Sequence, residues 1–325
     1  MASVLVTGGA GFIGSHVVDA YISSGYDVTV LDNLSNGRMG NVSPHARFVH
    51  ADVRSVEARQ LVESGHFEII NHQAAQIDVR SSIIDPQQDA AVNLDGLLNL
   101  LQGARRGDVG RLILASSGGA IYADGLPLPL EEAAPKLPMS PYGVAKLASE
   151  YYATVFANLT GIETIALRYS NVYGPRQNPD GEGGVVAIFA RRALAGESIP
   201  IYGNGEQTRD MVFVADVAEA NLAAIPWSGA GAKGVDAQAF NIGTGIETSV
   251  TQLAELIGRL AGRDYVIQHL EPRPGEVRRS AISPSKAHRE LGWQPRTSLS
   301  DGLRSTIEWL SQARSAPRWS RIQLE

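Results

Sequence analysis

The sequence contains no cysteine. A chain without thiols cannot form disulfides, thiolate metal sites or iron–sulfur clusters, and it cannot use a cysteine nucleophile. Its seven histidines show no ligand spacing such as His-Glu-x-x-His, so we predict no metal site. No run approaches about 18 consecutive apolar residues, which excludes a membrane-spanning helix. The first residues lack the basic leader and unbroken apolar core of a signal peptide, so we expect a cytoplasmic protein.

Positive charge is not in excess either. Lysine and arginine number 28 against 34 aspartates and glutamates, which gives a net charge of −6. Binding nucleic acid or an anionic membrane over a broad area needs a basic surface, so we expect neither partner. Charged residues make up 19% and hydrophobic residues 44% of the chain, a composition typical of globular proteins. At roughly 150 residues per domain, a chain of 325 residues predicts two domains.

Short β-rich segments alternate with helical segments over the first 115 residues. The strands are almost entirely apolar, which is the pattern of a parallel sheet covered by helices on both faces. We therefore predict an α/β fold, with a doubly wound parallel-sheet Rossmann domain in residues 1–170 and a smaller mixed α/β domain in residues 171–325. Some later segments are expected to return to the first sheet. The predicted strands are residues 4–6, 27–31, 48–50, 69–72 and 111–115, and the predicted helices include residues 12–24 and 90–104.

A long helix is predicted for residues 141–159 from signals at both of its ends. Ser140 can cap the helix, Pro141 suits its first position, and Gly161 follows its end. A strand is expected next, at residues 163–168, and the sequence that follows is richer in glycine and proline. This composition favours loops there.

Three glycines, Gly8, Gly11 and Gly14, lie between the first predicted strand and the first predicted helix. In such a pattern the first glycine permits a tight turn, the second lets a pyrophosphate approach the backbone, and the third lets helix and strand pack closely. Unpaired N–H groups at the helix N-terminus then favour phosphate. A glycine cluster can also be a purely structural turn, but its position between strand and helix favours a dinucleotide site.

Asp32 ends the second predicted strand, 18 residues after Gly14. A carboxylate there accepts hydrogen bonds from both adenosine ribose hydroxyls and repels a 2′-phosphate, so we predict NAD rather than NADP. Arg38 follows closely in sequence and weakens this preference slightly. Asp52 follows the third strand, where it can reach the adenine amino group or cap the next helix. Residues 73–75 follow the fourth strand, where small side chains either admit the cofactor or simply allow close packing.

Tyr142 and Lys146 form a Tyr-x-x-x-Lys pair on the predicted long helix. Residues four apart share one helix face, so the ammonium can lie near the phenol. A phenol of pKa about 10 is a poor base at neutral pH, and a nearby cation together with the positive nicotinamide ring is expected to favour the phenolate. The bare pattern is common on helix surfaces. Here it follows a dinucleotide fingerprint and a Ser-Ser-Gly-Gly loop, which favours catalysis.

Several segments together resemble the extended short-chain dehydrogenase/reductases, the NAD-dependent epimerases and dehydratases. They are TGGAGFIGSH, LDNLSNG, YGVAK, LRYSNVYGPRQ and TRDMVFVADVAEA, and the resemblance runs from about residue 2 to near residue 310. Within this family the chain is most similar to bacterial UDP-glucose 4-epimerases. The resemblance implies a homodimer that holds NAD and interconverts UDP-glucose and UDP-galactose. The sugar is oxidised at C4, the 4-keto sugar rotates, and hydride returns to its opposite face.

The resemblance also implies roles for individual residues. Tyr142 matches the catalytic base, and Lys146 matches the residue that holds the nicotinamide ribose and tunes the tyrosine. The residues that match the family's NAD contacts are Gly8, Gly11, Phe12, Ile13, Asp32, Asn33, Asn36, Gly37, Asp52, Val53, Gln73, Ala74, Ala75, Tyr142 and Lys146. Those that match its UDP-sugar contacts are Asn171 at the diphosphate, Tyr202 at the uracil, the phosphate-binding Arg209 and Arg273, and also Glu276 and Ser280. Two arginines can clamp a diphosphate on chemical grounds alone, although a surface ion pair is the alternative for each.

One departure from the family concerns the hydroxyl that hydrogen-bonds the sugar's 4-oxygen. The family carries Ser or Thr four residues before the tyrosine of its Ser-x-x-x-Tyr-Gly segment, and Gly118 stands at this position before Tyr122. Ser117 is therefore the expected donor, with Ser116 or a water molecule as alternatives. The same loop has no acidic residue, whereas the related sugar dehydratases and UDP-glucuronate decarboxylases carry one. Elimination is therefore not expected.

The exact sugar depends on another position. In UDP-hexose epimerases the residue seven positions after the phosphate-binding arginine faces the sugar's 2-substituent, and counting from Arg273 gives Ser280. A small residue there predicts room for an N-acetyl group, although a serine that ends a local turn is the alternative. UDP-glucuronate is the second choice of substrate, because Arg278 or Arg279 could pair with its carboxylate. A one-step nucleotide-sugar oxidoreductase and a non-catalytic NAD-binding module remain as alternative functions.

Overall fold

A parallel sheet of seven strands forms the centre of the first domain among the residues that the structure describes. The structure is a computed structural model, and it describes residues 2–179, 184–229, 231–272 and 277–315. The strand order is β10-β6-β5-β4-β1-β2-β3, and all neighbouring strands are parallel. The strands are β1 (Ser3–Thr7), β2 (Asp27–Asp32), β3 (Arg47–His50), β4 (Ile69–His72), β5 (Arg111–Ser117), β6 (Glu163–Tyr169) and β10 (Ala239–Ile242). The predicted doubly wound sheet is confirmed, and its switch point lies between β1 and β4.

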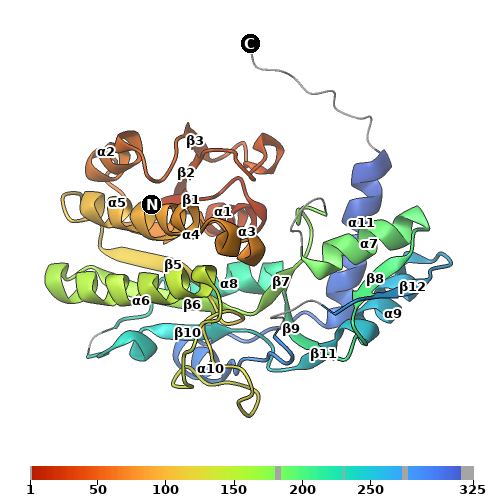
Figure 1. Cartoon of the computed structure of the whole chain (residues 1–325). Coiled ribbons are helices and arrows are strands. Elements are labelled where there is room, and N and C mark those ends of the chain that lie inside the picture. The colour runs from red at the N-terminus through yellow and green to blue at the C-terminus, as the bar shows by residue number, and fades with distance from the viewer. Residues whose placement is uncertain (1, 180–183, 230, 273–276, 316–325) are drawn as a thin grey trace.

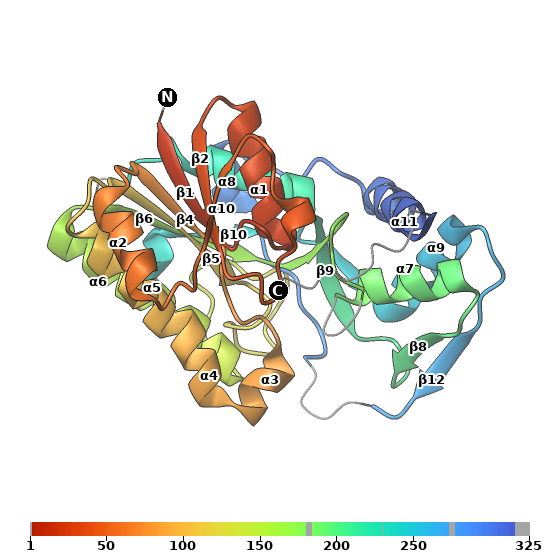
Figure 2. The same ribbon diagram turned by 90° about the horizontal axis from the view of Figure 1, so that it is seen from above.

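Helices cover both faces of this sheet (Figures 1 and 2). On β1, Val4 and Val6 belong to the core cluster on one face, and Leu5 belongs to the cluster on the other. Because both faces are buried, the strands are nearly all apolar. One layer contains α1 (Phe12–Ser23), α8 (Val214–Ala224) and α10 (Ser285–Leu291), and the other contains α2 (Val56–Ser64), α5 (Gly96–Ala104) and α6 (Pro141–Thr160).

The predicted end signals of the long helix are all present in α6. The hydroxyl of Ser140 accepts a hydrogen bond from the N–H of Gly143 at 3.1 Å, and Pro141 is the first helical residue. Gly161 ends the helix in the left-handed conformation, with φ +79°. Local signals therefore fix where the helix that carries Tyr142 and Lys146 begins and ends.

The chain between β4 and α5 is less regular than its sequence pattern predicts. It forms α3 (Val79–Ile84) and α4 (Pro86–Ala90), followed by a π-helical turn at Ala91–Asp95. The regular helix predicted for residues 90–104 is therefore wrong in its first turn. Single π turns occur frequently at functional sites, and this one packs against α6.

A smaller lobe lies beside the first sheet (Figure 1). Its described residues contain a sheet in the order β11-β9-β7 and a pair formed by β12 and β8. β10 belongs to the first sheet, and α8 and α10 belong to its helical layers, although all three follow residue 171 in the chain. The elements of the lobe are β7 (Asn171–Tyr173), α7 (Val185–Ala195), β8 (Ile199–Tyr202), β9 (Thr208–Phe213), β11 (Glu247–Ser249), α9 (Val250–Ala261), β12 (Ile267–Leu270) and α11 (Leu299–Ser315).

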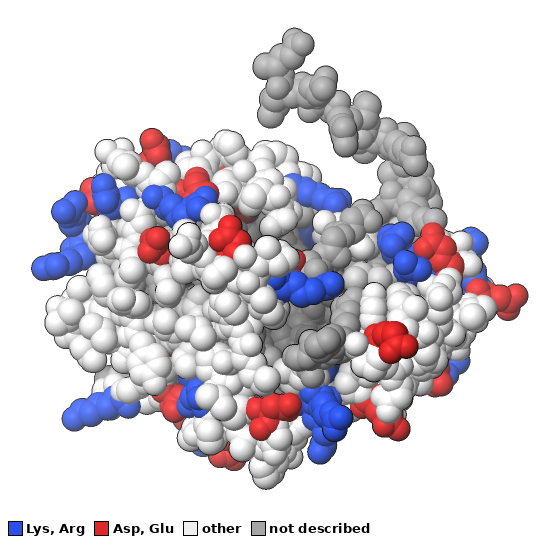
Figure 3. Space-filling view, viewed as in Figure 1, with Lys and Arg blue, Asp and Glu red and all other residues white. Residues whose placement is uncertain are grey.

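Within the described ranges, no helix combines the length and the apolar character needed to cross a bilayer. Acidic and basic side chains are interspersed over the face seen in Figure 3, and the surface is hollowed between the two lobes.

Candidate active site

The loop from β1 to α1 is built from glycines because its neighbours leave no room for side chains. Gly8 has φ +70°, and a Cβ atom there would lie 2.7 Å from the backbone nitrogen of Ala74. A Cβ atom on Gly14 would lie 2.2 Å from the carbonyl oxygen of Gly8. Gly11 precedes α1, no side chain caps the helix, and its first turn, which begins with Phe12 and Ile13, contains no acidic residue. The start of α1 therefore suits an anionic phosphate.

Asp32 lies at the end of β2, and its side chain is almost fully buried at 7% exposure. Its carboxylate accepts hydrogen bonds from the N–H groups of Ala10 at 3.0 Å and Leu34 at 2.8 Å. The following loop, with the exposed Asn33 and Asn36, folds back at Gly37, where a Cβ atom would lie 2.8 Å from Asp32 Oδ1. The sequence thus places a carboxylate, a tight turn and the glycine loop together.

Two neighbouring side chains have partners that the sequence did not indicate. The guanidinium of Arg38 donates to Asn178 Oδ1 at 3.2 Å. Asp52 forms an ion pair with Arg54 at 2.8 Å and accepts from Asn33 Nδ2 at 2.9 Å, and the bond from Arg54 holds the pKa of this carboxyl well below its usual range. The alternative of Asp52 as a helix cap is wrong.

The helix that follows β3 is capped by a different residue. The hydroxyl of Ser55 accepts from the N–H of Ala58 at 3.1 Å at the start of α2. Val53 is 5% exposed and packs with Leu97 and other side chains in the core cluster beside α2 and α5.

The loop after β4 is held by a polar network. Gln73 Nε2 donates to Asn71 Oδ1 at 2.7 Å and to the phenol oxygen of Tyr169 at 3.0 Å. The N–H of Ala74 donates to the hydroxyl of Thr7 at 3.3 Å. These bonds place Ala74 beside Gly8 and leave the next small residue, Ala75, partly exposed at the same edge of the sheet.

Tyr142, Lys146 and Ser117 meet where α6 begins and β5 ends. The side chain of Ser117 lies close enough to the phenol of Tyr142 to lower its pKa through a hydrogen bond. Lys146 is 6% exposed, its Nζ lies 5.8 Å from the centre of the Tyr142 ring, and it donates to the carbonyl of Ala115 at 3.1 Å. The sequence-based grouping of these three residues therefore has the geometry of a proton-transferring site.

Burial dominates the pKa values of both Tyr142 and Lys146. Burial raises the pKa of Tyr142 to about 12, the bond from Ser117 opposes this, and the charge of Asp89 adds to it. Burial lowers the pKa of Lys146 to about 8, against the charges of Asp89 and Glu150. Among the protein groups alone, burial dominates the pKa of Tyr142, so the expected stabilisation of the phenolate by a cation together with the nicotinamide ring stays a prediction. A further positive charge is needed for the phenolate.

Contacts within the fold distinguish Gly118 and Ser116 from Ser117. A Cβ atom on Gly118 would lie 2.5 Å from Ile282 Cδ1, so the family's serine or threonine would require the buried side chain of Ile282 to move. Ser116 is buried, and its hydroxyl donates to Glu150. Of the two serines, Ser117 is therefore the one placed at Tyr142.

The residues expected at the nucleotide lie on the smaller lobe. Asn171 starts β7, with its Oδ1 at 3.9 Å from the position of a Cβ on Gly119, and Tyr202 ends β8. Arg209 on β9 donates to the carbonyl of Val277 at 2.8 Å. Ser280 is 8% exposed and lies in an irregular segment. Two further expected residues, Arg273 and Glu276, lie outside the described residues.

The arginines expected to favour UDP-glucuronate do not converge on the site. Arg278 is exposed, and Arg279 forms an ion pair with Glu247 on β11, with its Nε at 2.8 Å from the carboxylate. In the described part of the chain, no group of three or more acidic or histidine side chains is arranged to hold a metal ion.

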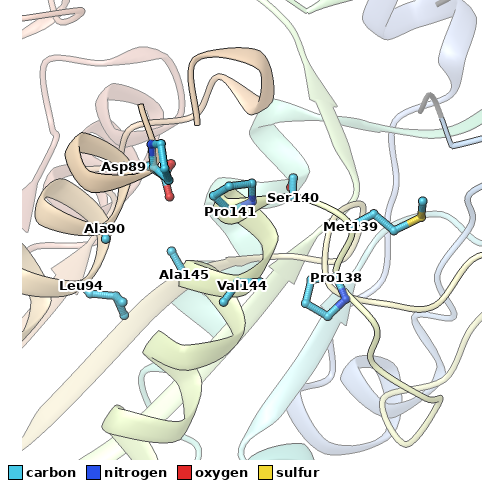
Figure 4. A pocket seen from close by; sticks show the side chains of 10 residues that line it. Asp89, Ala90, Leu94, Pro138, Met139, Ser140, Pro141, Val144 and Ala145 are labelled. Carbon is cyan, nitrogen blue, oxygen red and sulfur yellow. The ribbon is translucent and has the colours of Figure 1, made fainter. Parts of the chain in front are cut away.

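Sequence reasoning missed Asp89, which influences both Tyr142 and Lys146. It is 1% exposed, and its Oδ1 accepts from Gln76 Nε2 at 2.9 Å and Asn93 Nδ2 at 3.0 Å. Figure 4 shows it on α4, facing the start of α6. No sequence signal marks it, because its segment, Pro-Gln-Gln-Asp-Ala, reads as a polar helix start.

Known proteins match this chain over almost its whole length. A UDP-glucose 4-epimerase from Mycolicibacterium smegmatis is 41% identical over 310 residues, covering 94% of this chain and 97% of the relative. The crystal structure of a Thermotoga maritima UDP-glucose 4-epimerase with UDP-glucose is 44% identical, with a TM-score of 0.92 over 96% of this chain and 99% of that one. That of a Thermus thermophilus UDP-glucose 4-epimerase with NAD is 41% identical, with a TM-score of 0.87 and the same coverage. The model of the NAD dependent epimerase/dehydratase family matches residues 4–243, and the chain belongs to this family.

Proposed function

We propose that this protein is a UDP-glucose 4-epimerase, which interconverts UDP-glucose and UDP-galactose with bound NAD. The observation that carries the proposal is the cluster at the end of β5, where Ser117 bonds the phenol of Tyr142 and Lys146 lies 5.8 Å from the same ring. The Thermotoga and Thermus epimerases support it by sharing the fold over nearly all of the chain. The reaction connects galactose to glucose metabolism. Because NAD and UDP-sugars occur together in the cytoplasm, we place it there.

The residues present fit NAD. A Cβ atom on Gly14 would collide with the backbone of Gly8, so the glycines let the turn fold tightly beside the uncapped N-terminus of α1. Asp32 adds a carboxylate at the neighbouring strand end, as NAD recognition requires. We infer that the pyrophosphate binds at the start of α1 and the adenosine ribose at Asp32. When bound, NAD supplies the acceptor and donor of hydride at C4 of the sugar.

In the proposed mechanism, Tyr142 takes the proton from the 4-hydroxyl group, directly or through Ser117, as hydride leaves C4. The charge of Lys146 stabilises the phenolate form of Tyr142. The 4-keto sugar then turns within the site, and Tyr142 returns the proton when hydride comes back to the other face. Because the Gly118–Ala120 loop contains no acid or base, no group there promotes loss of water. Epimerisation is thus favoured over elimination.

The smaller lobe holds the nucleotide in this proposal. Arg209 and Arg273 take the diphosphate with Asn171, and Tyr202 packs at the uracil. These contacts keep the 4-keto sugar in the site while it turns. Ser280 leaves room for a 2-acetamido group, so we also propose turnover of the UDP-N-acetylhexosamine pair. Its side chain forms no hydrogen bond within the described residues, which speaks against a turn-capping role.

The test of the activity is conversion of UDP-galactose to UDP-glucose by the purified protein without added NAD. We expect turnover in both directions, NAD released on acid denaturation, and no net consumption of external NADH. A one-step reductase would instead consume NADH stoichiometrically. NAD binding without turnover of any UDP-sugar would identify a non-catalytic module.

We further propose that the protein is a homodimer that associates through the outer face of α6. Large apolar side chains on this face are exposed, with fractions of 53% for Val144, 56% for Tyr151, 51% for Val155 and 77% for Leu159. Their spacing of four and seven residues places them on one side of the helix. Figure 3 shows an area without charged side chains over α6. An exposed apolar face of this kind is typical of a protein contact.

A cavity of about 470 Å³ adjoins this face, between α4 and the first turn of α6 (Figure 4). Its lining includes Pro138, Met139 and Val144, so it continues the apolar surface. A two-fold axis at α6 would bring the same face of a second copy against it.

Sedimentation velocity tests the association. We expect a dimer for the unmodified protein and a monomer for the double variant Tyr151→Glu, Leu159→Glu. Val266→Glu is the control, because the exposure of Val266 (66%) lies between those of Tyr151 and Leu159 but the residue lies on the smaller lobe. A monomeric unmodified protein, or a double variant that still dimerises, would contradict the proposed interface.

A further inference from the structure

A buried ionic cluster lies directly behind the three proposed catalytic side chains. Ser116 on β5, Glu150 on α6 and Arg168 on β6 are 3%, 1% and 0% exposed. Ser116 precedes Ser117 in the chain, Glu150 follows Lys146 by about one helical turn, and Arg168 is the register partner of Ser116 between β5 and β6. No step of the proposed mechanism uses these three residues.

The guanidinium of Arg168 binds Glu150 in a two-pronged arrangement. Its Nε lies 3.0 Å from Oε1 and its Nη2 lies 2.7 Å from Oε2. The remaining donors reach the phenol of Tyr122 and the carbonyl of Glu132, both at 2.9 Å, and Oδ1 of Asp236 at 2.8 Å. The buried cation is therefore fully surrounded by acceptors, and its position is tightly defined.

Such a pair is a poor way to gain stability. Taking two charges out of water costs several kcal/mol per ion, and well-packed apolar side chains often replace a buried pair without loss. What a fully bonded pair does supply is a defined geometry. Here it ties the helix that carries Tyr142 and Lys146 to the adjacent strand β6.

Ser116 extends this tie to β5. Leu112 and Leu114 belong to the core cluster on the α6 side of the sheet, and Ser116 continues their alternation toward Glu150. A serine hydroxyl has one proton to donate, and Ser116 gives it to the Glu150 carboxylate. Ser117, the last residue of the strand, is left to bond Tyr142.

We propose that Glu150 is a positioning residue for the epimerase reaction: by holding Ser116, it fixes the end of β5 so that Ser117 contacts Tyr142. This inference rests on the proposed function. It goes beyond that function by explaining why Ser117, and not its neighbour, faces the phenol. The charge of Glu150 also opposes the effect of burial on the pKa of Lys146, so the same carboxylate supports a second member of the site.

The most specific test removes the hydrogen bond between Ser116 and Glu150 and leaves the ion pair of Glu150 with Arg168 in place. Glu150→Ala leaves the buried Arg168 without its main counter-charge and is expected to impair folding. Ser116→Ala leaves Glu150 and Arg168 paired and removes only the hydroxyl. Because misplacing a reacting group by about 1 Å can cost as much as 10²-fold, we expect kcat to fall at least about 10-fold, with KM and NAD content unchanged. Ser116→Thr, which keeps the hydroxyl, should recover most of this loss.

A double-mutant cycle separates positioning from a general loss of structure. If Ser116 acts through Ser117, adding Ser116→Ala to Ser117→Ala lowers kcat no further. Thr164→Val is the matched control, since Thr164 is a buried strand hydroxyl bonded to Gln238 at 3.0 Å, toward the other end of the sheet. An equal loss in both backgrounds, no loss in Ser116→Ala, or the same loss in Thr164→Val would overturn the inference.

A structural readout makes the test independent of the sugar that is turned over. A crystal structure of Ser116→Ala should show Ser117 displaced from Tyr142, with the Glu150–Arg168 pair intact. An unchanged bond between Ser117 and Tyr142 would overturn the inference even if the activity is confirmed. Absence of epimerase activity in the unmodified protein would refute the proposed function, while this structural result would still decide the role of Glu150.

Discussion

Replacing Lys146 by methionine tests the electrostatic core of the proposed mechanism, because methionine keeps the approximate size and removes the charge. The ammonium lies 5.8 Å from the centre of the Tyr142 ring. If the distance to the ring centre is taken as the charge separation, an effective dielectric constant of about 20 gives an attraction of about 3 kcal/mol between ammonium and phenolate. This corresponds to a factor of about 100 in the acid dissociation of the phenol. We therefore expect Lys146→Met to lower kcat by about 100-fold at neutral pH.

The sign of the pH dependence follows from which form is active. Tyr142 acts as the phenolate, so kcat rises with pH, and loss of the cation moves this rise to higher pH. Lys146 is charged below its pKa of about 8, so the variant's deficit should be largest below that pH and narrow above it. The measurement is kcat against pH for both proteins at equal NAD content.

Lys136→Met is a matched control for this experiment, because Lys136 Nζ lies 6.0 Å from the ring of Tyr122, outside the proposed catalytic cluster. We expect its pH profile to match that of the unmodified protein. A deficit in Lys146→Met that is the same at every pH would refute the electrostatic reasoning, since it would indicate a purely structural or cofactor-holding role.

Three further predictions concern single positions of the site. Tyr142→Phe should retain NAD and UDP-sugar binding, measured by ligand titration, while kcat falls at least about 10²-fold. Near-normal turnover would exclude Tyr142 as the base. Asp32→Ala should weaken NAD retention and reduce the protein's preference for NAD over NADP in competition binding. If the unmodified protein binds NADP more tightly than NAD, the role assigned to this carboxylate is contradicted. Ser280→Tyr should lower turnover of the N-acetylated sugars by about 5- to 150-fold, the effect of about 1–3 kcal/mol of steric overlap, with Ser280→Ala as the control. An equal change on both sugar pairs would discard this gate.

The elements that sequence predicts well are those whose signals are local. The bounds of α6 follow from Ser140, Pro141 and Gly161, which act within one turn of the helix ends. The glycine turn and Asp32 likewise lie within one strand–helix–strand unit. The short strands β7, β9 and β11 escaped prediction, because each has only three to six residues and becomes a strand by pairing with distant segments.

Local sequence also failed where a side chain's role depends on a distant partner. Arg168 looks like an ordinary end of a strand, yet it is fully buried because Glu150, on the preceding helix, supplies its counter-charge. Gly118 looked like the loss of a catalytic hydroxyl. In the fold, the side chain of Ile282 occupies the space that a Cβ would need. We propose that Ser117, one residue earlier, carries the hydroxyl instead, so that the departure at Gly118 moves the proton donor along β5 without removing it.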